Sequence, residues 1–259
     1  MGGERAAGRQ RRNSLTVLPG DCCQWWAATT LARMDTVTKA SAAACLAPTS
    51  MVDSEHATIR AYALQHSAAH NDDRSRAVAL YYAIRDGIRY DPYGLDLSEH
   101  GLRASTTLAA GRGWCVPKAV LLAALCRAIG IPAALGYADV RNHLSTERMR
   151  QQMQTDVFYW HGYTAILLDG RWVKATPAFN IELCEKFRIR ALEFDGREDS
   201  IYHPLDLDGR QHMEYLAYRG EFAEVPLAQM SADFRKYYPG VSDNLAQADF
   251  ERDVDAEQV

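Results

Sequence analysis

Residues 111–132 read GRGWCVPKAVLLAALCRAIGIP, and this stretch decides the fold class. The apolar run after Cys115 predicts a buried helix that continues to Ile129. Pro117 suits the first helical turn, where its missing N–H is not needed, and Gly130 is typical of the position just past a helix C-terminus. Cys115 therefore lies at or just before the N-terminus of a helix.

A β-hairpin is predicted over residues 162–176, because Asp169 and Gly170 form a strong two-residue turn signal. This turn pairs Leu168 with Arg171, Tyr163 with Thr176 and His161 with Ala178. If the pairing continues past Pro177, Thr176 and Asn180 are the diagonal neighbours of His161.

Cys115 and His161 are the candidate catalytic pair. The partial positive charge of a helix N-terminus lowers the pKa of a thiol, and a nearby imidazolium lowers it further. In acyl transfer the thiolate attacks a carbonyl and the imidazolium protonates the leaving group. The backbone N–H of Cys115 is the candidate oxyanion donor. The alternative is that Cys115 is a buried, inert cysteine.

These motifs resemble the transglutaminase-like superfamily over residues 45–185. The resemblance is carried by GWC at 113–115, CRAIGIPA at 126–133, HGY at 161–163 and DGRWV at 169–173, with IRY at 88–90 ahead of the cysteine loop. It implies an α+β, papain-like transglutaminase core, in which the nucleophile helix packs on an antiparallel β-sheet. It also implies Cys115 as the nucleophile and His161 as the general base and acid.

The third catalytic position departs from this family. The family usually has an aspartate that orients the histidine, where the second strand ends in Asp-Pro, and this chain has Thr176-Pro177 there. The Thr176 hydroxyl is the first replacement to consider, by position. Asn180 is the second, by analogy with the asparagine of papain-like enzymes, although an ordinary turn residue is an equal alternative. A third possibility is that no such group exists and the protein is a weak enzyme or none.

Three aromatic residues near these motifs are candidates for substrate binding: Trp114, Tyr90 and Trp160. Trp114 is adjacent to the nucleophile and could form a wall of the acyl pocket. Aromatic residues near a sheet are more often part of the core, so core packing is the alternative for all three.

Composition excludes several other classes. The 259 residues are 47% hydrophobic and 24% charged, which is typical of a globular protein. The net charge of −4 gives no support for nucleic-acid binding. No apolar run reaches the 18 residues of a membrane span. No metal or nucleotide motif is present, so we expect no cofactor.

Six scattered cysteines without a CxxC pair favour a reducing compartment. With no credible export signal, the expected location is cytoplasmic. We expect a flexible N-terminal extension over residues 1–40, a transglutaminase-like domain over 41–241 and a solvated acidic tail over 242–259. Met34 is an alternative natural start.

Three functions are compatible with these residues. The first is a cysteine-dependent hydrolase that cleaves an amide or peptide bond in a peptide, a protein or a small amide. The second is an amide-forming acyltransferase of the transglutaminase type, in which an amine accepts the acyl group. The third is a catalytically inactive binding module, which the missing aspartate favours and the intact Cys115 and His161 oppose.

Overall fold

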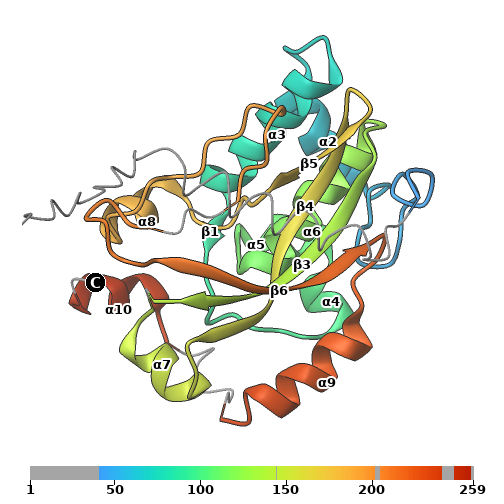
Figure 1. Ribbon diagram of the computed structural model, residues 1–259. Helices are drawn as coiled ribbons and strands as arrows, with labels where there is room; N and C mark the ends of the chain where they lie inside the picture. The colour runs from blue at the N-terminus through green and yellow to red at the C-terminus, as the bar shows by residue number, and fades with distance from the viewer. Residues whose placement is uncertain (1–40, 144, 202–204, 241–247, 258–259) are drawn as a thin grey trace, which may run out of the picture. The chain divides into compact units, whose positions relative to one another are not determined.

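The computed structural model describes residues 41–143, 145–201, 205–240 and 248–257 (Figure 1). These residues belong to one compact unit, Val37–Val259, and the second unit, Met1–Thr36, lies outside the described residues. The expected extension over residues 1–40, the alternative start at Met34 and the expected boundary at residues 241–242 therefore also lie outside them.

The described residues form a mixed α/β structure with a four-stranded antiparallel sheet in the order β5-β4-β3-β6. The strands are β1 (Arg89–Tyr90), β2 (Arg112–Gly113), β3 (Ala133–Asn142), β4 (Val157–Leu168), β5 (Arg171–Ala175) and β6 (Met213–Phe222). The helices are α2 (Ala57–Ser67), α3 (Asp73–Gly87), α4 (Glu99–Leu102), α5 (Ala104–Ala110), α6 (Cys115–Ala128), α7 (Glu147–Met153), α8 (Ile181–Lys186), α9 (Leu227–Tyr237) and α10 (Phe250–Glu257).

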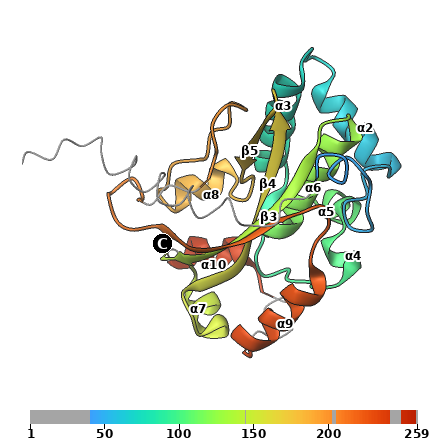
Figure 2. The same ribbon diagram turned by 45° about the vertical axis from the view of Figure 1, so that its right-hand side comes forward.

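Helix α6 is the central element of the core. Its residues from Cys115 to Arg127 are all buried, as expected for a helix that is apolar on every side. It packs on β4 and β3, and α2, α3 and α5 contact it as well (Figures 1 and 2). Gly130 follows the helix with a φ of 85°, which confirms the predicted stop. The short parallel pair β1–β2 places Tyr90 opposite Gly113, next to the loop that leads into α6.

The sequence also predicts two helices, one capped by Asp53 or Ser54 that runs towards His66, and one from about Arg74 to Gly87. The first is α2, but it begins at Ala57 and is capped by His56, whose Nδ1 accepts a hydrogen bond from the backbone of Thr58. Asp53 instead accepts a bond from the backbone N–H of Ser105, 3.1 Å away. The one expected over residues 74–87 is α3, which Asp72 caps through the backbone N–H of Ser75.

The predicted hairpin is formed by β4 and β5. Leu168 pairs with Arg171, and both turn residues, Asp169 and Gly170, have the positive φ values that such a turn requires. The pairing ends earlier than expected, at Thr164 with Ala175.

The chain leaves the hairpin at Thr176, whose backbone N–H donates to the carbonyl of Ser200, 3.0 Å away. Pro177, the next residue, has no N–H with which to resume a ladder. The expected pairs of Tyr163 with Thr176 and of His161 with Ala178 are therefore absent from the ladder.

A bulge interrupts the pairing of β4 with β3 immediately before His161. Ala138 pairs with His161 and Val140 with Phe158, so Tyr159 and Trp160 together face a single residue, Asp139. Trp160 has a φ of 62°, and its N–H donates to Asp139. The bulge breaks the simple alternation of side chains along β4.

The acidic C-terminal segment is helical where the structure describes it, which corrects the expectation of a solvated, frayed tail. Phe250 and Val254 lie one turn apart on α10 and are both buried, so they anchor the helix in the core. Asp253 accepts bonds from the hydroxyl of Tyr93 and from Arg148, on α7. Figure 2 shows α7, α9 and α10 near the same end of the sheet.

Candidate active site

Cys115 is the first residue of α6 and is 7% exposed. Burial raises the pKa of its thiol to about 11, although hydrogen bonds from the backbone of Gly162 and Val116 lower it. The lowered thiol pKa that we expected from the helix N-terminus is therefore wrong for this structure, because loss of hydration outweighs the helix. The thiol is protonated at neutral pH.

His161 lies on β4, directly before the glycine that contacts the Cys115 thiol. Burial, and secondly the charge of the nearby His212, lower the pKa of His161 to about 3. The imidazole is therefore neutral at neutral pH, as a general base must be before it accepts a proton. The two candidate residues form a neutral thiol and a neutral imidazole rather than an ion pair.

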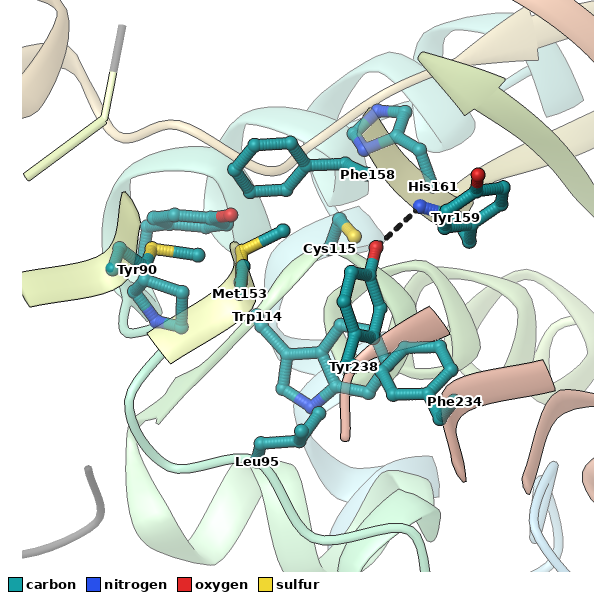
Figure 3. Close-up of a pocket in the computed structure, with 12 residues that line it drawn as sticks. Tyr90, Leu95, Trp114, Cys115, Met153, Phe158, Tyr159, His161, Phe234 and Tyr238 are labelled. Carbon is teal, nitrogen blue, oxygen red and sulfur yellow. Dashed lines mark hydrogen bonds between the residues drawn. The ribbon is translucent and has the colours of Figure 1, made fainter. Parts of the chain in front are cut away.

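One pocket brings Cys115 and His161 together, and Figure 3 shows it from close by. Its cavity volume is about 50 Å³. Its walls come from β1 and the loop that follows it, and from the residues at the start of α6. Helix α7, strand β4, helix α9 and the residue that follows α9 complete them. The lining residues are Tyr90, Pro92, Leu95, Trp114, Cys115, Met149, Met153, Phe158, Tyr159, His161, Phe234 and Tyr238.

Two of the three aromatic residues predicted to bind substrate lie in this pocket. Trp114 and Tyr90 both line it next to Cys115. Trp160 does not, because the bulge in β4 turns it elsewhere: its indole N–H donates to Asp233, 2.9 Å away, and the guanidinium of Arg219 lies 4.5 Å from its ring centroid. Trp160 is thus a structural residue behind the site, and its prediction as a substrate contact is corrected.

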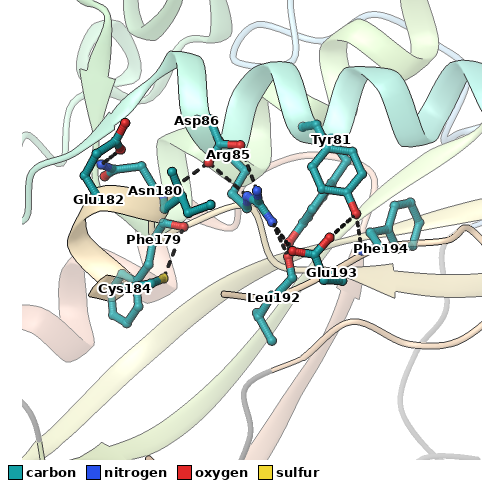
Figure 4. A network of polar contacts seen from close by, with 12 residues as sticks. Tyr81, Arg85, Asp86, Phe179, Asn180, Glu182, Cys184, Leu192, Glu193 and Phe194 are labelled. Carbon is teal, nitrogen blue, oxygen red and sulfur yellow. Dashed lines mark hydrogen bonds and ion pairs between the residues drawn. The ribbon is translucent and has the colours of Figure 1, made fainter. Parts of the chain in front are cut away.

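The two candidates for the third catalytic position differ in their surroundings. The hydroxyl of Thr176 is buried and has no hydrogen-bond partner among the described residues. Asn180 is engaged at both ends of its amide. Its Oδ1 accepts from the backbone N–H of Tyr90, 3.1 Å away, and its Nδ2 donates to Glu182, 2.8 Å away (Figure 4). Asn180 therefore holds β1 and α8 together.

Residues 60–177 match the family model of the transglutaminase-like superfamily. This part of the chain is similar to that superfamily. The matched residues of the transglutaminase-like core include Cys115, His161 and Thr176, and they run from α2 to just past β5.

Two solved structures resemble the chain at low identity. A proposed cysteine protease from Cytophaga hutchinsonii is 19% identical, with a TM-score of 0.42 over 71% of this chain and 48% of that one. A proposed protease from Parabacteroides distasonis is 15% identical, with a TM-score of 0.35 over 52% of this chain and 26% of that one. The chain thus spans about half of the first protein and a quarter of the second. No curated protein matches the chain.

Part of the pocket lies outside the matched core. Phe234 and Tyr238 come from α9 and the residue after it, and both line the pocket. The Tyr238 hydroxyl accepts from the backbone N–H of Tyr159 and donates to the carbonyl of Val157. Neither residue was predicted from the sequence to have a role. The apolar spacing of Met230, Phe234 and Tyr238 was the available signal for a helix face that packs on the core.

Lys118, one turn after Cys115 on α6, was not predicted from the sequence either. Lys118 is fully buried, and its ammonium donates to three backbone carbonyls, those of Arg85, Ile88 and Ala178. Burial lowers the pKa of Lys118 to about 7. A lysine near the start of an otherwise apolar helix, far from the arginine at its other end, was the signal that could have indicated it.

Other kinds of site find no support in the described part of the chain. Within the described ranges, no group of three or more His, Cys, Asp or Glu side chains is arranged to hold a metal ion. None of the described helices combines the length and apolar character that crossing a membrane requires. The four cysteines of the described part, Cys45, Cys115, Cys126 and Cys184, are free and buried.

Proposed function

We propose that this protein is a cysteine-dependent hydrolase that cleaves an amide or peptide bond, with Cys115 as nucleophile and His161 as general base and acid. One observation carries the proposal: on a transglutaminase-like core, these two residues come from different elements and line the same pocket. Its substrates are peptides, proteins or small amides.

The reaction begins from the neutral pair. As the sulfur attacks the substrate carbonyl, the thiol proton passes to His161, and negative charge develops on the carbonyl oxygen. The backbone N–H of Cys115, at the N-terminus of the 14-residue helix α6, is the proposed donor to that oxygen. The C–N bond then breaks, His161 protonates the departing amine, and a thioester remains on Cys115.

Water completes the cycle. His161 accepts a proton from water as the water oxygen attacks the thioester carbonyl. The C–S bond breaks, the sulfur takes the proton back, and a carboxylic acid leaves. If an amine attacks in place of water, the product is a new amide, which is the transglutaminase-type alternative.

For the third position we propose Thr176 rather than Asn180, whose amide is occupied. The buried hydroxyl of Thr176 makes no hydrogen bond to a described residue in the free protein, His161 included, and is therefore available to the imidazole when His161 takes up the thiol proton. The test compares Thr176→Val with Asn180→Ala. We expect Thr176→Val to lower kcat by roughly a hundred-fold with little change in stability. We expect Asn180→Ala to destabilise the fold by about 1–3 kcal/mol, because the buried N–H of Tyr90 loses its acceptor. Unchanged kcat in both variants would refute a third catalytic role for either residue.

The function itself is tested on a mixture of peptides and peptide amides, with products identified by mass spectrometry. We expect new acids and amines with the wild type and none with Cys115→Ala or His161→Ala. A new amide on addition of a primary amine would indicate the acyltransferase instead. If wild type and Cys115→Ser both release no product but retain the same ligand, the protein is a binding module.

A further inference from the structure

We propose that the pocket beside Cys115 binds a compact aliphatic group on the acyl side of the scissile bond. This inference rests on the proposed hydrolase and names the class of substrate that it takes. The wall residues that carry it are Met149 and Met153 on α7, Phe158 on β4 and Phe234 on α9.

The polarity of the walls excludes a charged substrate group. Among the described residues, the lining includes no carboxylate, ammonium or guanidinium side chain. The Tyr238 hydroxyl already bonds to the backbone of Tyr159 and Val157, so it is committed before a substrate arrives. A charged group that entered would lose its hydration without a partner of opposite charge.

The size of the cavity points to a small occupant. A volume of about 50 Å³ is several times the roughly 10–15 Å³ that a single water needs on the same measure, so it offers room for a few non-hydrogen atoms. A branched group of a few carbon atoms can enter with small shifts of the two methionines, whose side chains are adaptable. An aromatic double ring requires much larger movements of the walls. Each CH₂ group that leaves water on binding raises the binding constant by about four-fold.

The direction of the group follows from its neighbours. Trp114, directly before the nucleophile in sequence, lies in the pocket together with Phe234, and their ring centroids are 6.0 Å apart. A group attached to the carbonyl that Cys115 attacks therefore reaches these walls within a few bonds. Phe234 lies outside residues 60–177, the part of the chain that matches the family model.

The test measures alkylation of Cys115 by chloroacetamides, whose N-substituents are joined to the sulfur through a CH₂ and a carbonyl group and so lie within a few bonds of it. Three reagents are compared at one alkaline pH: N-isobutyl, N-carboxymethyl and N-naphthylmethyl chloroacetamide. Each rate at Cys115, read by peptide mass spectrometry, is divided by the rate of that reagent with glutathione. We expect the isobutyl reagent to exceed each of the others by ten-fold or more.

Two substitutions of the same kind provide the comparison. Met153→Gln makes one pocket wall polar at nearly constant length, and we expect it to reduce the preference for isobutyl over carboxymethyl at least three-fold. Met213→Gln makes the same change at a buried methionine outside the lining, and should retain the wild-type preference. If Met153→Gln does not fold, Phe234→Ser provides a second polar wall, with Phe234→Leu as its conservative partner that retains the preference.

The outcomes separate the two proposals. Equal normalised rates for the three reagents, or a preference that polar walls leave unchanged, would overturn the aliphatic pocket while Cys115 remains a reactive nucleophile. Failure of every chloroacetamide to modify Cys115 in the folded protein would overturn the pocket assignment alone, whereas release of no product from peptides and peptide amides by the wild type, measured alongside, would overturn the proposed hydrolase and the pocket assignment with it.

Discussion

Cys115 and His161 show how burial decides the protonation state of the proposed catalytic pair. The thiol is at the N-terminus of a helix and receives backbone hydrogen bonds, yet burial raises its pKa to about 11 and lowers that of His161 to about 3. The free protein therefore holds a neutral pair, and in the proposed reaction the proton moves to His161 as the sulfur attacks.

The pH dependence of alkylation tests this state directly. With iodoacetamide, we expect the rate at Cys115 to keep rising beyond about pH 8.5, the ordinary value for a thiol, because its pKa is raised. The rate is read by peptide mass spectrometry from mildly acidic to strongly alkaline pH on the wild type and on His161→Ala. A plateau reached already in acidic solution by the wild type, and lost in His161→Ala, would instead demonstrate a preformed thiolate–imidazolium pair.

At the scale of single residues, the sequence predicts those residues of the pocket that a local motif marks. Cys115 and Trp114 precede a helix whose start is marked by Pro117, and both line the pocket. Trp160 could not be placed, because its direction depends on a bulge opposite Asp139 that neither strand indicates by itself. Asn180 could not be placed either, because its partner is the backbone of Tyr90, distant in sequence.

At the scale of elements, Gly162 sets how closely β4 approaches α6. A Cβ at this position would lie 3.0 Å from the Cα of Val116 and 3.3 Å from the carbonyl oxygen of Cys115, and both are backbone atoms that cannot rotate away. We expect Gly162→Ala to lower the free energy of unfolding by about 1–3 kcal/mol and to slow hydrolysis, because it separates His161 from Cys115.

Urea unfolding and substrate hydrolysis measure the two effects. Gly94→Ala is the matched control, since a Cβ there would lie 3.7 Å from its nearest neighbour, Asp91, at ordinary van der Waals distance. Equal stability and activity of the two variants would show that the contact between β4 and α6 is looser than the structure indicates.

Lys118 ties the C-terminal end of α3 and the segment after β5 to α6 through three carbonyls. Burial lowers its pKa from 10.5 to about 7, so above pH 7 the unfolded chain binds more protons than the folded one. We therefore expect the free energy of unfolding to rise as the pH increases from about 7 to about 8.5 in the wild type, and this rise to be absent in Lys118→Met.

Urea unfolding at several pH values between about 7 and about 8.5 gives the slope of the free energy of unfolding against pH for the wild type and for Lys118→Met. The raised thiol pKa values change the free energy of unfolding only above the ordinary thiol pKa of 9.0, so they do not contribute to the slope between about pH 7 and about pH 8.5. The same slope in both proteins would mean that Lys118 keeps its ammonium form throughout, held by the three carbonyls.

The elements themselves were largely predictable, because α6 and the β4–β5 hairpin carry strong turn and helix-end signals. The sequence of residues 213–220 is compatible with either a strand or a short helix, and these residues form part of β6. The early end of the hairpin was not predictable, because Thr176 turns to pair with Ser200, on a distant segment without a strand pattern.

At the scale of the whole molecule, α10 connects the chain's acidic end to the wall of the pocket. Two of its carboxylates hold α7, which carries Met149 and Met153: Asp253 binds Arg148, and Glu257 accepts from the backbone N–H of Glu147. The acidic composition of this segment concealed Phe250 and Val254, whose burial becomes evident only when the rest of the core is present.

Burial rather than charge should hold α10 in place. We expect Phe250→Ala to lower the free energy of unfolding by about 3 kcal/mol, because Phe250 is buried against the rings of Tyr90 and Tyr93. Raising the sodium chloride concentration from about 0.1 to about 1 M should change the free energy of unfolding by less than about 1 kcal/mol, because exposed ion pairs are weak and are screened by salt. Both are read from urea unfolding, and a larger loss with salt than with Phe250→Ala would reverse this assignment.

Trp114 gives the site an optical property. Its indole forms part of the pocket beside the nucleophile, and the emission of an indole moves to shorter wavelengths when apolar material replaces water around it. The indole of Trp160 does not line the pocket, is held by its bond to Asp233 and contributes a steady background. The arrival of an acyl group at the sulfur should therefore be visible as a change in the protein's own fluorescence, without a label.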